Sequence, residues 1–104
     1  MTSILPAEVG YFTEVYEDHL GPGEAVWKTI GPSEVYSQCA VLVTAHAFAG
    51  VTEGLPTHVL KVDDVNVTLS AGVVKNEFYL GFNVINNGNT TIRSWGVTVG
   101  LIGP

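Results

Sequence analysis

The sequence is poor in charged residues, above all in basic ones. Only four of its 104 residues are Lys or Arg, against ten Asp or Glu, which gives a formal net charge of −6. Nucleic-acid binding draws most of its affinity from basic side chains on phosphates, and anionic membranes attract the same side chains. We therefore expect neither a nucleic acid nor a membrane as a partner.

Cysteine is almost absent as well. The single Cys39 excludes a disulfide within the chain. It lies in an apolar run far from any basic residue, so we interpret it as a small buried hydrophobe. The N-terminus lacks a basic and then apolar leader, and polar residues interrupt the uncharged run 35–52. We expect neither a signal peptide nor a membrane span.

The patterns that accompany catalysis and metal binding are also missing. The closest pair of histidines, His46 and His58, is twelve residues apart, whereas zinc sites have closely spaced ligands. No Gly-x-Ser-x-Gly segment marks a nucleophile, and nothing selects a pair of carboxylates. We predict that the protein is not an enzyme, with no catalytic residue, no metal and no cofactor.

What the sequence does contain is the alternation of β-strands. Hydrophobic residues make up 46% of it, enough for a core. Strands are predicted over residues 9–16, 25–30, 35–48, 59–69, 78–85 and 91–102. Six to eight strands with closely spaced turns predict one all-β domain over residues 1–104, an antiparallel β-sandwich or jelly-roll-like fold.

Details of the pattern make further predictions. The Asn-Gly pair at residues 87–88 is a strong hairpin signal and predicts that the last two strands pair. Asp63 and Asp64 mark a bend or a junction between two strands. Trp95 shares its alternate set with Val97 and Val99, which predicts a core tryptophan rather than a ligand-facing one. Glycines occupy the other face of that strand, so something must pack closely there.

Charge is distributed unevenly along the chain. Residues 1–34 hold six acidic residues and one lysine, a net charge of −5, whereas residues 35–104 are close to neutral at −1. The first segment is an acidic arm or edge, and the second supplies the core strands. Either the acids are a solvated edge that blocks aggregation, or they dock on a partner. For the docking alternative we predict interface residues Tyr11, Phe12, Glu14, Tyr16, Glu17 and Asp18.

A short, acidic, all-β chain without a chemical site resembles the small decoration, or cement, proteins of tailed-phage capsids. The resemblance is one of type, spans the whole chain and transfers no individual residue. It implies a β-sandwich that forms homo-oligomers, commonly trimers, and clamps neighbouring capsomers. The partners would be copies of the chain itself and the major capsid protein. The location would be the virion surface, after synthesis in the host cytoplasm.

A second resemblance concerns the C-terminal part of the chain. The segment Phe78-Tyr79-Leu80-Gly81-Phe82-Asn83-Val84, the turn that follows it, and Ser94-Trp95-Gly96-Val97-Thr98-Val99 look like the last strands of H-type lectins and related phage-fibre tips. This resemblance implies a six-stranded sandwich that binds carbohydrate. We keep it as the alternative to capsid decoration.

Overall fold

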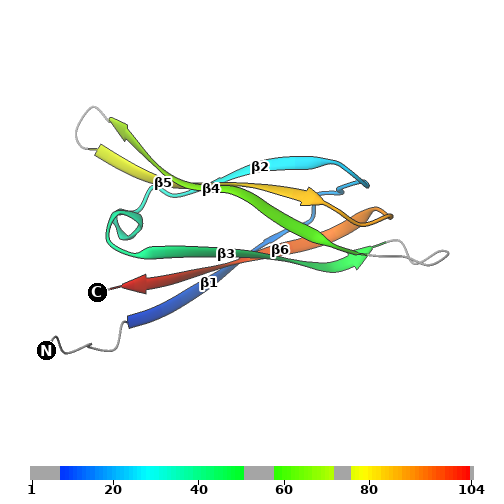
Figure 1. The fold of residues 1–104 in the computed structure, drawn as a ribbon, viewed down its shortest axis with the longest axis horizontal. Coiled ribbons are helices and arrows are strands. Elements are labelled where there is room, and N and C mark those ends of the chain that lie inside the picture. Colours follow the sequence, from blue (N-terminus) through cyan, green and yellow to red (C-terminus); the bar gives the residue numbers. More distant parts are fainter. Residues whose placement is uncertain (1–7, 51–57, 72–75, 104) are drawn as a thin grey trace, which may run out of the picture.

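The computed structural model describes residues 8–50, 58–71 and 76–103, which form six strands and one short 3₁₀ turn (Figure 1). The elements in chain order are β1 (Glu8–Tyr16), β2 (Ala25–Ile30), η1 (Glu34–Ser37), β3 (Ala40–Gly50), β4 (Leu60–Ala71), β5 (Asn76–Asn86) and β6 (Ile92–Gly103). Within these ranges, no helix has the length and apolarity needed to cross a bilayer.

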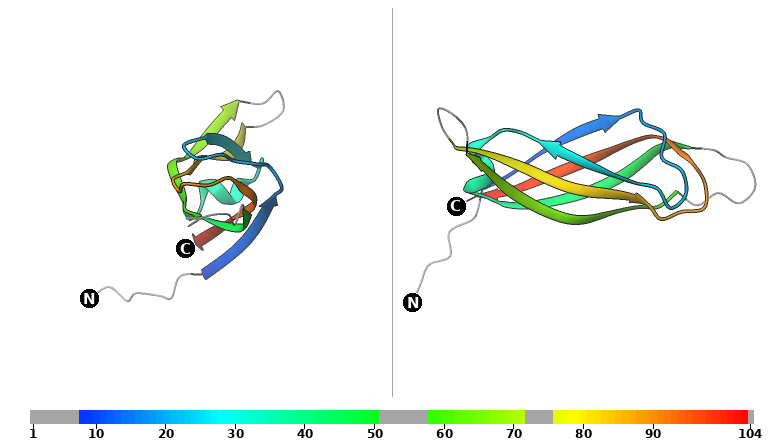
Figure 2. Two further views of the ribbon diagram at one scale, coloured as in Figure 1. Left: turned by 90° about the vertical axis from the view of Figure 1, so that its right-hand side faces the viewer. Right: turned by 90° about the horizontal axis from the view of Figure 1, so that it is seen from above.

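The strands pair into two antiparallel three-stranded sheets. One sheet has the order β1-β6-β3 and the other has the order β2-β5-β4. The sheets lie one above the other as the two layers of a sandwich (Figures 1 and 2). This arrangement confirms the predicted all-β sandwich. The acidic segment contributes β1 and β2, each an edge strand of its sheet, while residues 1–7 lie outside the described part of the chain.

The core lies between the two central strands. Leu80, Phe82 and Val84 of β5 face the other sheet and are fully buried. Trp95, Val97 and Val99 of β6 fill the same layer from the opposite side. Because successive side chains on a strand point to opposite faces, these residues fix which face of every paired strand is inward. The prediction of a core tryptophan at position 95 is confirmed.

The predicted hairpin between the last two strands is wrong. β5 and β6 follow one another in the sequence but belong to different sheets. Their apolar faces meet across the core, so residues 87–91 cross from one sheet to the other. Sheets pack about 10 Å apart, and a connection of this length spans that gap easily. The Asn-Gly pair therefore predicts the turn correctly, but the strands on either side of that turn do not pair with each other.

Asn86 holds this crossing in place. Its side-chain amide donates hydrogen bonds to the carbonyl oxygens of Leu20 and Thr90, both at 2.8 Å. Its side-chain oxygen accepts the backbone N–H of Gly88 at 3.0 Å. Leu20 also forms an isolated bridge with Ile92 through two backbone hydrogen bonds. The turn is thus tied to the segment that joins β1 to β2.

The third predicted strand begins later than its apolar sequence indicates. Residues 34–37 form the 3₁₀ turn, because the Ser33 hydroxyl accepts the N–H of Val35 and caps it. Tyr36 points into the core from this turn. Cys39 precedes β3 and is half-buried rather than buried, which corrects its predicted burial. From Val41 to Ala47 the odd-numbered side chains face inward, as the alternation predicts.

The Asp63-Asp64 pair marks a bulge rather than a junction between two strands. β4 is continuous, but its register to β5 shifts between Asp63 and Asn66. Asp64 has a positive φ of 52°, and its carbonyl oxygen accepts a hydrogen bond from the Asn66 amide at 2.9 Å. Extra residues in one strand bend it locally and increase its twist.

Candidate functional site

The residues predicted as an interface do not form one surface. Tyr11 lies on the outer face of β1 and is 78% exposed, whereas its neighbour Phe12 packs against the core. Glu14 and Glu17 are exposed. Tyr16 and Asp18 belong to a cluster at one edge of the sandwich. The alternation of β1 separates side chains that are adjacent in the sequence.

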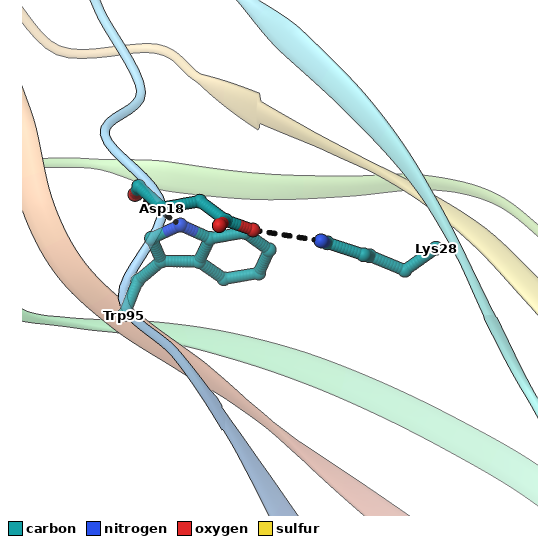
Figure 3. Close-up of polar contacts among 3 residues, drawn as sticks. All are labelled: Asp18, Lys28 and Trp95. Carbon is teal, nitrogen blue, oxygen red and sulfur yellow. Dashed lines mark hydrogen bonds and ion pairs between the residues drawn. The ribbon is translucent and has the colours of Figure 1, made fainter.

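That cluster centres on Lys28 (Figure 3). The Lys28 ammonium lies 2.8 Å from Asp18 Oδ2 and 4.4 Å from the centre of the Tyr16 ring. Trp95 stacks against Tyr16, with ring centres 4.6 Å apart, and donates its Nε1–H to the Asp18 carbonyl oxygen at 3.1 Å. Burial, assisted by the nearby Glu14 and Asp18 carboxylates, raises the pKa of Tyr16 above its usual value.

The Lys28 cluster has a structural role, because it links the two sheets. It joins the segment after β1 to β2, which belongs to the other sheet. The Lys28 ammonium, the Asp18 carboxylate and the Trp95 indole N–H are all paired within the cluster. The two outer faces of the sandwich remain as candidate functional surfaces.

The first face is the outside of β1-β6-β3. Strand register sets its side chains in three rows across the sheet. The rows are Tyr11–Gly100–Leu42, Thr13–Thr98–Thr44 and Val15–Gly96–His46, with Phe48 beyond the last row. We call these ten residues the threonine-row face. It holds no Asp, Glu, Lys or Arg.

Large apolar side chains remain open on the threonine-row face. Tyr11, Val15, Leu42 and Phe48 are between 54% and 78% exposed. The Phe48 ring lies over Gly96, where a Cβ atom would come within 2.7 Å of it. This confirms the predicted close packing on the glycine face of β6. Gly96 and Gly100 on its central strand place no side chain on this face.

The second face is the outside of β2-β5-β4, and it carries a groove. Trp27, Thr29, Thr68, Ser70, Tyr79 and Gly81 line it. Thr29 lies opposite Gly81 on one side, and Thr68 lies opposite Tyr79 on the other. The groove has a volume of about 380 Å³, within the ~300–1,000 Å³ range of small-molecule sites.

Sequence reasoning missed both outer faces. Leu42 and Phe48 stood in a strand interpreted as mostly buried, and Trp27 and Tyr79 are 52 residues apart. Alternation shows which residues of a strand share a face. Which of the two faces points outward can be decided only when the inward residues are known. Within the described ranges, no group of three or more His, Cys, Asp or Glu side chains could hold a metal ion.

Comparison with known proteins adds no relative. No family model, no curated protein and no solved structure matches the chain.

Proposed function

We propose that the protein is a non-enzymatic structural subunit that associates with copies of itself through the threonine-row face and decorates a larger protein shell. The observation that carries this proposal is a face without Asp, Glu, Lys or Arg on which four large apolar side chains stay exposed. Apolar patches open on the surface of soluble proteins mark interaction sites.

The charge distribution favours a second copy as the occupant of this face. Each chain carries a net charge of −6, so copies repel one another over most of their surface. The threonine-row face is a region where two copies can meet without opposing carboxylates. Its polar groups are hydroxyls and the His46 imidazole. These groups can pair with one another, as Thr13 and Thr98 do within the chain at 3.4 Å.

The size of the face points to many weak contacts rather than one strong contact. Three strands about 4.8 Å apart, with nine residues rising about 3.3 Å each, give a footprint of roughly 15 by 30 Å. That is smaller than the ~800 Å² that each partner buries in a standard interface. Weak contacts become effective when many copies are held side by side, because the effective concentration rises.

The setting we propose is the capsid of a tailed phage. Its support is the resemblance in type to cement proteins, which are small, acidic and all-β and which stabilise shells by contacts alone. A trimer is the oligomer that this resemblance implies. The major capsid protein would be the second partner.

A charge placed on the face tests self-association. Leu42→Asp should lower the mass measured by light scattering to that of one chain, because the carboxylate would be buried unpaired in the contact. Leu69→Asp is the matched control: Leu69 is 55% exposed, against 60% for Leu42, and lies on β4. Self-association by this face is contradicted if both variants keep the wild-type mass, or if the wild type is itself a single chain.

Decoration is tested separately by co-sedimentation with shells assembled from a tailed-phage major capsid protein. Wild type should sediment with the shells and raise the temperature at which they break. If the chain stays in the supernatant at every concentration, the capsid setting is wrong, whatever its own oligomeric state.

A further inference from the structure

We propose that the groove on the outside of β2-β5-β4 is a binding site for a neutral saccharide. It is formed by strands that do not contribute to the threonine-row face, and it does not involve the buried Trp95. The inference is independent of self-association and of the capsid setting.

Trp27 supplies an apolar platform. The indole is 50% exposed although it is the largest side chain on β2. It lies over Gly81, where a Cβ atom would come within 2.5 Å of the six-membered ring. A side chain at position 81 would push the indole away from the sheet. Glycine therefore lets the edge of the six-membered ring lie close to the sheet while half of the indole surface stays exposed.

Tyr79 forms a second aromatic wall in a defined orientation. Its hydroxyl donates a hydrogen bond to Glu77 Oε2 at 2.7 Å. This bond raises the pKa of Tyr79 above its usual value and holds its hydroxyl toward Glu77. A fixed ring loses little conformational freedom when a ligand stacks on it.

Hydroxyl groups line the rest of the groove. Thr29 reaches it from β2, and Thr68 and Ser70 reach it from β4. The Thr68 hydroxyl donates to Asn66 Oδ1 at 3.1 Å, which leaves its oxygen lone pairs facing outward as acceptors. Hydroxyls on both sides of aromatic rings can donate to and accept from a ligand rich in hydroxyls.

These features together match a sugar ring. A pyranose has an apolar face of C–H groups that lies flat on an indole or phenol, and its edge carries hydroxyls that both donate and accept. No charged side chain lines the groove, and the nearest charged group that contacts a lining residue is the Glu77 carboxylate. Because the chain as a whole is acidic, the ligand should carry no negative charge.

The two tryptophans make the site measurable. Trp27 is half exposed and Trp95 is fully buried, so acrylamide quenches the fluorescence of Trp27 selectively. The probes are maltohexaose, cellohexaose, mannohexaose and the hexamer of N-acetylglucosamine, with oligogalacturonate as the acidic comparator. At least one neutral oligosaccharide should protect Trp27 from quenching at concentrations up to about 10 mM, and oligogalacturonate should not.

Variants then assign the binding to the groove, with affinities measured by calorimetry. Trp27→Ala should weaken the affinity at least tenfold, about 1.4 kcal/mol. Thr68→Val, which keeps the side-chain shape, should weaken it about threefold or more through the lost hydrogen bond. Tyr11→Ala removes an exposed aromatic from the other sheet and should change it less than about twofold.

Leu42→Asp separates this proposal from the proposed self-association. It should abolish oligomers and leave the saccharide affinity per chain unchanged. The saccharide site is contradicted if no neutral probe protects Trp27, if only the acidic probe binds, or if folded Trp27→Ala and Thr68→Val both bind like wild type.

Discussion

Asn86 is the one polar side chain buried in the core of the described residues. Its amide makes three hydrogen bonds to backbone groups of Leu20, Thr90 and Gly88. Removing the amide takes away all three hydrogen bonds at once, although the Leu20 carbonyl oxygen still accepts the N–H of Ile92. A buried polar group that loses its hydrogen bond costs about 1–3 kcal/mol.

We therefore expect Asn86→Ala to lower the free energy of unfolding by about 2–4 kcal/mol in urea denaturation. Asn83→Ala, three residues earlier on the same strand and facing outward, should change it by less than about 0.5 kcal/mol. Equal losses in the two variants would show that the junction does not depend on the Asn86 amide.

Tyr16 and Tyr36 give a prediction about alkaline pH. Burial raises the pKa of both phenols, with the Glu14 carboxylate adding to the effect. The unfolded chain then loses these protons more readily than the folded chain, so stability decreases with rising pH. The free energy of unfolding should be level below about pH 10 and fall above it. In Tyr16→Phe/Tyr36→Phe the fall should be shallower. An unchanged slope would contradict this assignment.

At the level of strands, the sequence predicts what alternation alone can specify. β2 has its predicted bounds, and the odd-numbered side chains from Val41 to Ala47 of β3 point inward as their spacing indicates. The alternation of apolar and polar residues does not determine which strands pair with each other. The β5 and β6 strands, joined by an Asn-Gly turn, read as a hairpin, yet their strongly apolar inward faces pack against each other across the core.

The 3₁₀ turn shows a second limit. Val35 and Tyr36 have high β-propensity and continue into an apolar run, so the sequence favours a strand over them. The Ser33 cap and the burial of Tyr36 stabilise a turn instead. The groove could not be predicted from the sequence either. Its lining residues are brought to one place only by the register of β2 and β4 on β5.

The bulge in β4 gives a prediction at this scale. Asp64 adopts a positive φ of 52°, which glycine accepts freely and β-branched residues resist. Asp64→Gly should leave stability unchanged or raise it by up to about 1 kcal/mol, and Asp64→Val should lower it by about 1–2 kcal/mol. Thermal unfolding of the two variants tests this. If valine is tolerated as well as glycine, the backbone at position 64 is not left-handed.

The whole molecule has two outer faces of different chemistry. One carries four large exposed apolar side chains and no Asp, Glu, Lys or Arg, and the other is grooved and lined with aromatic rings and hydroxyls. Because the faces belong to different sheets, one chain can pack against a copy of itself through the first and keep the second open. The acidic residues of the described part of the chain lie outside the threonine-row face and the groove lining.

The separation of the acidic residues from the proposed contact predicts that salt strengthens self-association. Copies with a charge of −6 repel one another, and their proposed contact contains no ion pairs that salt could weaken. Raising sodium chloride from about 20 mM to about 500 mM shortens the Debye length from roughly 20 Å to below 5 Å. Self-association measured by light scattering should become stronger. Weaker association at high salt would indicate a contact made by charged residues.

Sedimentation equilibrium of the wild-type chain tests the central claim most directly. If the threonine-row face is covered by another copy, the average mass should rise with concentration from 11.1 kDa towards a fixed multiple of it. Leu42→Asp should stay at the single-chain mass over the same range. A wild-type chain that remains at 11.1 kDa up to about 1 mM, where even millimolar affinities become visible, would contradict the account.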